Sequence, residues 1–76
     1  MITYDRLWAY MKKNGVSQYR LINQGISHST LSRLKHNQPV NTDTLDKLCS
    51  IMDCELEDIA KFEKSSEMIK RVNGKI

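Results

Sequence analysis

The apolar positions at the start of the chain recur every three or four residues, which is the period of an amphipathic α-helix. They predict a helix over residues 4–13, with Thr3 able to cap its start. Gly15 ends this helix, because glycine adopts the left-handed backbone conformation at little cost. The aromatic members of the stripe, Trp8 among them, are expected in the core rather than on a stacking surface. The residues of the inward stripe are Tyr4, Leu7, Trp8 and Met11.

Two shorter helices are expected next. Ser17 and Ser27 are the residue type that favours a helix N-cap, so we place helices over about residues 18–24 and 28–36. Gly25 separates them and allows a tight connection. The apolar residues that hold these two helices to the body are Leu21, Ile22, Ile26, Leu31 and Leu34.

The second half of the chain predicts two further helices. Asn37 ends the preceding helix, and Pro39 prevents it from resuming at once. Asn41 or Thr42 caps a fourth helix, and a fifth runs over about residues 56–62. The inward-facing residues of these two helices are Leu45, Leu48, Cys49, Met52, Leu56, Ile59 and Ala60.

These elements indicate an all-α fold, a compact bundle of about five short helices around one core. A chain of 76 residues is long enough for one small domain. We assign residues 1–62 to this domain and residues 63–76 to a polar tail or an extension of the last helix. No stretch alternates apolar and polar residues as a half-buried strand would.

Charge is divided unevenly along the sequence. No Asp or Glu occurs between Arg6 and Thr42, a stretch that carries a charge of +6, whereas residues 43–58 carry −5 and residues 59–76 carry +3. This division favours one face for a polyanion and another face turned away from it. A solvated basic surface would give the same count, so charge alone does not decide.

Composition argues against several classes of function. Two cysteines are too few for a disulfide scaffold or a four-ligand zinc site, and both are expected to be small buried residues. His28 has no carboxylate or second ligand placed to partner it, and no nucleophile–base pair or phosphate loop appears. We therefore expect no enzyme activity, cofactor, metal or small-molecule ligand. The N-terminus lacks a signal-peptide layout and no apolar run could span a bilayer, so we expect a cytoplasmic protein without membrane contact.

Residues 17–37 resemble the helix-turn-helix of the phage Cro/repressor type, the lambda-repressor-like family. The resemblance extends over roughly residues 3–62 and rests on the segments LWAYMKKNGVSQYRLI, GISHSTLSRLK and TLDKLCSIMDCELEDI. One departure is present. The segment LINQGIS is one residue shorter than the family pattern, and Ile22 stands where a small residue is usual.

This resemblance implies a sequence-specific DNA-binding transcriptional regulator, in particular a repressor, with the helix over residues 28–36 in the major groove. It also implies a homodimer on a palindromic operator, in the nucleoid of a bacterial or phage-infected cell. The base-reading candidates are His28, Ser29, Thr30 and Arg33. The candidates for contact with the DNA backbone are Ser17, Gln18, Tyr19, Lys35, His36, Asn37, Asn41 and Thr42.

An alternative stays open on the sequence alone. A helix-turn-helix scaffold can act as a protein-interaction module or an antirepressor, and the acidic segment 43–58 and the tail are features that it could use. For several site residues a plain structural role also fits. Ser17, Asn41 and Thr42 could be helix caps alone, and Tyr19 could pack on the edge of the core.

Overall fold

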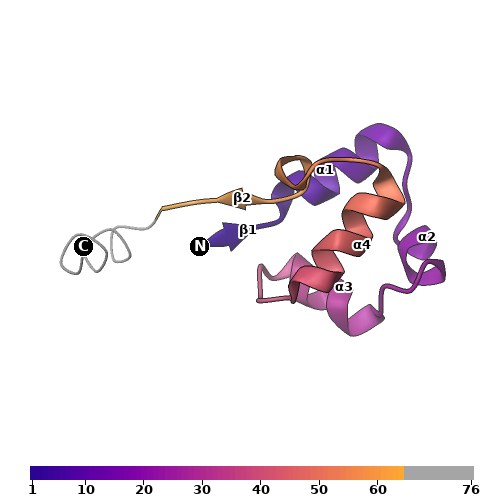
Figure 1. The fold of residues 1–76 in the computed structure, drawn as a ribbon, viewed down its shortest axis with the longest axis horizontal. Coiled ribbons are helices and arrows are strands. Elements are labelled where there is room, and N and C mark those ends of the chain that lie inside the picture. The colour runs from indigo at the N-terminus through magenta and orange to yellow at the C-terminus, as the bar shows by residue number, and fades with distance from the viewer. Residues whose placement is uncertain (65–76) are drawn as a thin grey trace.

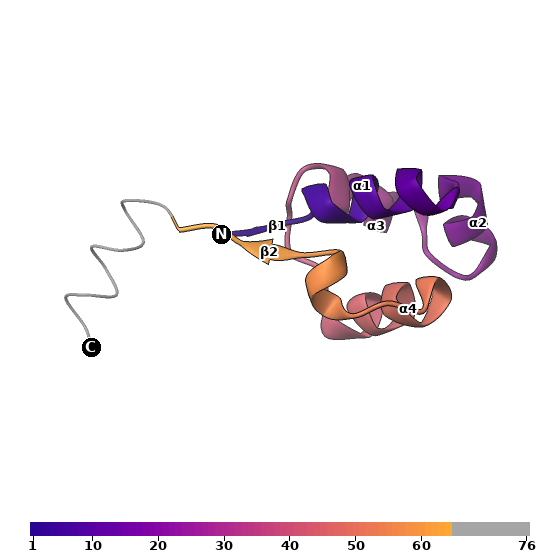
Figure 2. The ribbon, with the colours of Figure 1, turned by 90° about the horizontal axis from the view of Figure 1, so that it is seen from above.

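The computed structural model describes residues 1–64 of the chain. Four α-helices form the body, and a short two-stranded ribbon extends from one end of it (Figure 1). Both views place α2 at the end of the body opposite to the ribbon (Figure 2). The elements are β1 (Ile2–Thr3), α1 (Asp5–Asn14), α2 (Gln18–Asn23), α3 (His28–Lys35), α4 (Thr42–Met52), the 3-10 turn η1 (Leu56–Asp58) and β2 (Lys61–Phe62).

Three of the helices begin at the caps that the sequence predicts. The Ser17 Oγ accepts a hydrogen bond from the Arg20 backbone N–H at 3.1 Å. The Ser27 Oγ accepts one from the backbone N–H of Thr30 at 3.2 Å. At the start of α4, Asn41 rather than Thr42 is the cap. Each side chain satisfies one of the backbone donors that a helix start leaves unpaired.

Each α-helix of the described residues ends next to a residue in the left-handed conformation. These residues are Gly15 (φ 67°), Gly25 (φ 105°), Asn37 (φ 54°) and Asp53 (φ 50°). At Gly25 the Ile26 N–H donates to the Leu21 carbonyl at 3.0 Å and the Gly25 N–H donates to the Ile22 carbonyl at 3.1 Å. This is a Schellman motif, and the two residues that it brings together, Leu21 and Ile26, are both buried. The shortened connection between α2 and α3 is thereby closed with its backbone groups paired.

In the described part of the chain, one apolar cluster forms the core, and each α-helix contributes residues to it. Leu7, Leu21, Leu34, Leu48 and Ile59 are fully buried. Their spacing in the sequence predicts that they face the core, and the structure confirms this prediction. Trp8 and Leu45 are partly buried against the cluster. The remaining members of the cluster are Tyr4, Met11, Ile26, Leu31 and Met52.

The prediction of five helices and an all-α fold is wrong in its last element. Residues 56–62 form the single turn η1 and then the strand β2, not a helix. Ile59 points into the core as expected, but Leu56 is 51% exposed. Thr3 does not cap α1, because it lies buried in β1 and the N-cap position belongs to Tyr4. Most of the predicted tail, residues 65–76, lies outside the described residues.

The ribbon joins two segments that are far apart in the sequence. Strand β1 pairs antiparallel with β2, with Ile2 opposite Phe62 and Thr3 opposite Lys61. One residue further out, the Met1 amino group donates to the Glu63 carbonyl at 2.8 Å and the Glu63 N–H donates to the Met1 carbonyl at 2.8 Å. This pairing closes the fold at the end away from α2 (Figure 2).

Candidate nucleic-acid interface

Helix α3 has two faces of opposite character. On one face Leu31 and Leu34 are 3% and 0% exposed, and they hold the helix to the core. The other positions of the helix are polar, and all but one of them are exposed. An α-helix with its side chains is about 10–12 Å across and the major groove is about 12 Å wide, so the exposed face of α3 can enter the groove.

The four base-reading candidates lie together on the first turns of α3. His28, Ser29 and Arg33 are exposed, and Thr30 is half-buried. The Ser27 hydroxyl donates to the Thr30 Oγ1 at 2.9 Å and lies 3.2 Å from the Ser29 Oγ. These contacts hold the serine and threonine hydroxyls in a small network at the N-terminal end of the helix. Arg33 lies one turn further along, with its guanidinium on the exposed face.

The candidates for contact with the DNA backbone at the start of α2 are all exposed. Ser17 acts as a cap and is itself exposed, so its capping role does not bury it. Gln18 is exposed, and Tyr19 is 72% exposed and does not pack on the core. Arg20 is a further exposed basic residue of α2. Its charge is part of the +6 of the acid-free stretch, and this position in the sequence is the signal that could have marked it as a candidate.

Among the candidates from Lys35 onward, three have side chains that form hydrogen bonds within the protein. Lys35 and Thr42 are exposed. The His36 Nδ1 lies 2.8 Å from the Ser32 carbonyl, which fixes the imidazole against the last turn of α3. The Asn37 Oδ1 accepts a hydrogen bond from the Tyr4 N–H at 2.8 Å, so this amide has a structural role. The Asn41 Oδ1 accepts from both the N–H and the hydroxyl of Thr44, at 3.1 and 3.0 Å.

Neither α2 nor α3 carries an acidic residue, and two of the acidic residues lie in a groove beside α1. Glu57 and Asp58 line a groove on the far side of α1 together with Arg6, Tyr10 and Lys13. In that groove the Arg6 Nη1 donates to the Glu57 carbonyl at 2.9 Å. The Arg6 side chain is thus directed toward η1.

The residues of the described part of the chain do not assemble a metal site, because no three His, Cys, Asp or Glu side chains come together there. Within residues 1–64, no helix has the length and apolar character needed to cross a membrane. Cys49 and Cys54 are half-buried free thiols. Burial, together with the neighbouring Cys49, raises the pKa of the Cys54 thiol to about 11. A thiol with such a pKa is protonated at neutral pH and is a weak nucleophile.

Among protein families, the chain matches the Cro/C1-type HTH DNA-binding domain over residues 6–65. Comparison with curated proteins gave no match, and neither did comparison with solved structures. The matched range contains α2, α3, α4 and all of α1 except its first residue, and thus the exposed polar face described above. The family is one of DNA-binding domains, which agrees with the absence of acidic residues from α3, and it is typically non-enzymatic. This chain belongs to the Cro/C1-type helix-turn-helix DNA-binding domain family.

Proposed function

We propose that the protein is a sequence-specific transcriptional regulator, and a repressor in its simplest mode, that reads double-stranded DNA with α3. The observation that carries the proposal is the two-faced character of α3. Leu31 and Leu34 anchor it, and its exposed face carries hydroxyl, imidazole and cationic groups without a carboxylate. A carboxylate on that face would repel phosphates, whereas these groups suit base edges and phosphate oxygens.

Each side chain has a role that follows from its chemistry. Arg33 can donate two parallel hydrogen bonds to the O6 and N7 of a guanine, which is the commonest base-specific contact in the major groove. Ser29, Thr30 and His28 are short enough to let the helix backbone come close to the bases, and each can donate or accept. Lys35, Gln18 and Tyr19 flank this face, where they contact phosphates and fix the register of the helix without reading sequence.

We further propose that two copies bind a palindromic operator, with one α3 in each half-site. One recognition helix of eight residues contacts only a few base pairs, which is too little for strong specific binding. Two copies related by a twofold axis read two half-sites one helical turn apart, about 34 Å. Repression follows when such a dimer covers a promoter. The protein then works in the compartment that holds the DNA, the bacterial cytoplasm.

The test is selection of bound sequences from a randomised duplex pool, followed by titration of the enriched duplex at two salt concentrations. The proposal expects an enriched palindrome and an affinity that falls steeply as salt rises, because each phosphate contact releases counterions. Binding without any enrichment would contradict a sequence-specific reader. Absence of binding at moderate salt would contradict the DNA-binding proposal altogether and favour a protein partner.

A further inference from the structure

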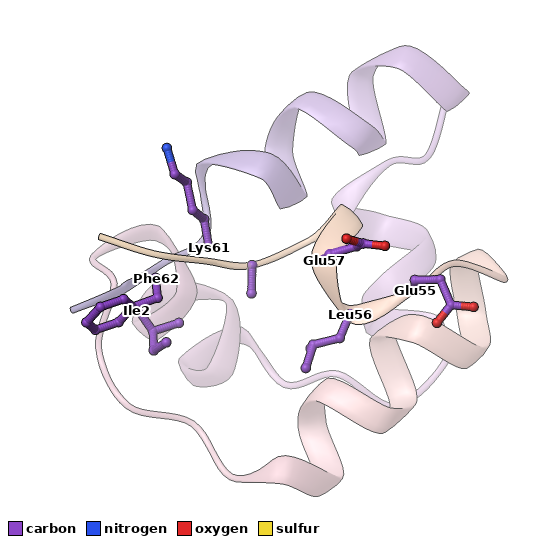
Figure 3. A pocket seen from close by; sticks show the side chains of 7 residues that line it. Ile2, Glu55, Leu56, Glu57, Lys61 and Phe62 are labelled. Atoms are coloured by element: carbon purple, nitrogen blue, oxygen red, sulfur yellow. The ribbon is translucent and has the colours of Figure 1, made fainter. Parts of the chain in front are cut away.

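Large apolar side chains gather at the ribbon end of the molecule. Among the described residues, five large hydrophobic side chains are exposed, and four of them lie on the ribbon and η1. Met1, Ile2, Leu56 and Phe62 are 52%, 46%, 51% and 51% exposed, and we call these four residues the ribbon face. Ile2 and Phe62 lie side by side, and Leu56 projects to the same side of the ribbon, with Lys61 on the other (Figure 3). Contiguous exposed apolar side chains of this kind mark an interaction surface.

The ribbon face shares a groove with the residues that follow α3. Ile2, Leu56 and Ala60 line two adjoining grooves, one on each side of Leu56. The larger groove, of about 440 Å³, runs along the connection Asn37–Val40, which directly follows α3. Half-buried Leu45 is also in its lining. A molecule bound in this groove therefore contacts the residues that directly follow α3.

The ribbon also offers unpaired backbone groups. Met1 and Glu63 exchange both of their backbone hydrogen bonds, so Ile2 and Phe62, the next pair, are a non-hydrogen-bonded pair. The N–H and C=O groups of such a pair point outward, to the two edges of the ribbon. The sheet of the described residues has only these two strands, so both edges are open. An open edge beside apolar side chains is a template for pairing with another chain.

We propose that the ribbon face is the surface through which two copies of this chain associate, and this rests on the proposed function for the need of a twofold dimer. A twofold axis brings the same patch of each copy against itself. Glu55 and Glu57 border the ribbon face on the η1 side, and Lys61 borders it on the β2 side. The twofold operation can thus set the acidic border of one copy against the basic border of the other.

Association of two copies through the ribbon face is compatible with DNA binding by both copies. The ribbon and α2 lie at opposite ends of the body (Figures 1 and 2), so association through the ribbon leaves α2 free. The larger groove lies beside the residues that follow α3, so the C-terminal ends of the two α3 helices come nearest to the axis. The exposed positions His28, Ser29 and Arg33 face outward on each copy and stay available to one half-site each.

Sedimentation equilibrium of the full chain from about 5 to 500 μM tests the interface, comparing the unaltered protein with Leu56→Glu. Leu56 is half exposed in the monomer, so the fold tolerates the change, which circular dichroism checks. The proposal expects a concentration-dependent dimer whose dissociation constant rises at least about tenfold in Leu56→Glu, because a carboxylate is forced into an apolar contact. Ala9→Glu, an exposed site on α1, adds the same charge elsewhere and should leave the dimer unchanged. A monomer at all concentrations, or equal loss in both variants, would overturn the proposal.

A second readout separates this proposal from the proposed function. Leu56→Glu should keep the affinity of the unaltered protein for a duplex with one half-site, and lose at least about tenfold on the full palindrome. Dimers of the unaltered protein that bind no DNA would refute the function and leave the interface standing. Equal binding of the full palindrome by Leu56→Glu and the unaltered protein would refute the interface and leave the function standing.

Discussion

The Oδ1 atom of Asn37 accepts a hydrogen bond from the backbone N–H of Tyr4 at 2.8 Å, across 33 positions of sequence. Asn37 ends α3 in the left-handed conformation, and Tyr4 is the buried residue from which α1 starts. The bond ties the end of α3 to the beginning of α1. One asparagine thus does two things, because its backbone closes α3 and its side chain pairs a donor that α1 leaves open.

Replacing Asn37 by glycine separates those two contributions. Glycine keeps the left-handed backbone and gains about 0.5–1 kcal/mol there, but an unpaired N–H on a buried residue costs about 1–3 kcal/mol. We expect Asn37→Gly to lower the free energy of unfolding by about 1 kcal/mol in urea denaturation. An Asn37→Gly chain as stable as the unaltered one would show that the Tyr4 bond contributes nothing.

Asp53 gives the matched comparison, because it has the same left-handed backbone at the end of α4. No side-chain bond of Asp53 holds it there in the described structure, and its negative charge faces the negative end of the helix dipole. Asp53→Gly should therefore raise the free energy of unfolding by about 0.5–1 kcal/mol. A change of the same sign in Asp53→Gly and Asn37→Gly, measured under identical conditions, would refute this account of the two helix ends.

Ser27 caps α3, so Ser27→Ala tests how much the cap stabilises this helix. Ser27→Ala should cost about 1 kcal/mol of stability and speed amide hydrogen exchange in the first turn of α3, near Thr30. Ser50→Ala is the control, because Ser50 lies within α4 and donates only to the Asp46 carbonyl at 2.9 Å. It should be neutral or slightly stabilising. Equal exchange rates in α3 for both variants would argue against the cap.

The Cys54 thiol gives a pH dependence of known sign. Its pKa is raised from 9.0 to about 11 in the folded protein, so the folded state holds this proton more tightly than the unfolded state. The stability that this contributes is present at neutral pH and is lost as the pH rises from about 9 to about 11. We expect urea denaturation to show a smaller fall in stability over this range for Cys54→Ala than for the unaltered chain. Identical pH profiles would contradict the raised pKa. The comparison is needed because burial also raises the pKa of Tyr4.

Local signals in the sequence were enough to predict most of the helical body. The serine caps, the glycine stops and the three-to-four spacing of leucines act within one or two turns, and they put α1 to α4 within one or two residues of their observed bounds. The exposed face of α3 is predicted from the same spacing. Because Leu31 and Leu34 face the core, the polar residues between them face solvent.

The misassigned parts depend on contacts between distant segments. Ile59 and Ala60 fit a helix or a strand equally well over so short a stretch, and only pairing with Ile2 and Thr3 makes residues 61–62 a strand. Leu56 was assigned to the core because it is apolar, yet it lies half exposed on the ribbon face. The hydrogen bond from the Tyr4 N–H to the Asn37 Oδ1 is likewise invisible in the sequence, because its two partners are 33 positions apart.

The central claim is that α3 reads DNA through its exposed face, and the affinity of Arg33→Ala for the selected duplex tests it most directly. Lys13→Ala is the control, because it removes one positive charge from the groove beside Glu57 and Asp58, away from α3. We predict a loss of roughly 10- to 100-fold for Arg33→Ala, with relaxed preference at one base pair, and a change within about twofold for Lys13→Ala. Equal affinities of the two variants, with the base preference intact, would contradict the claim.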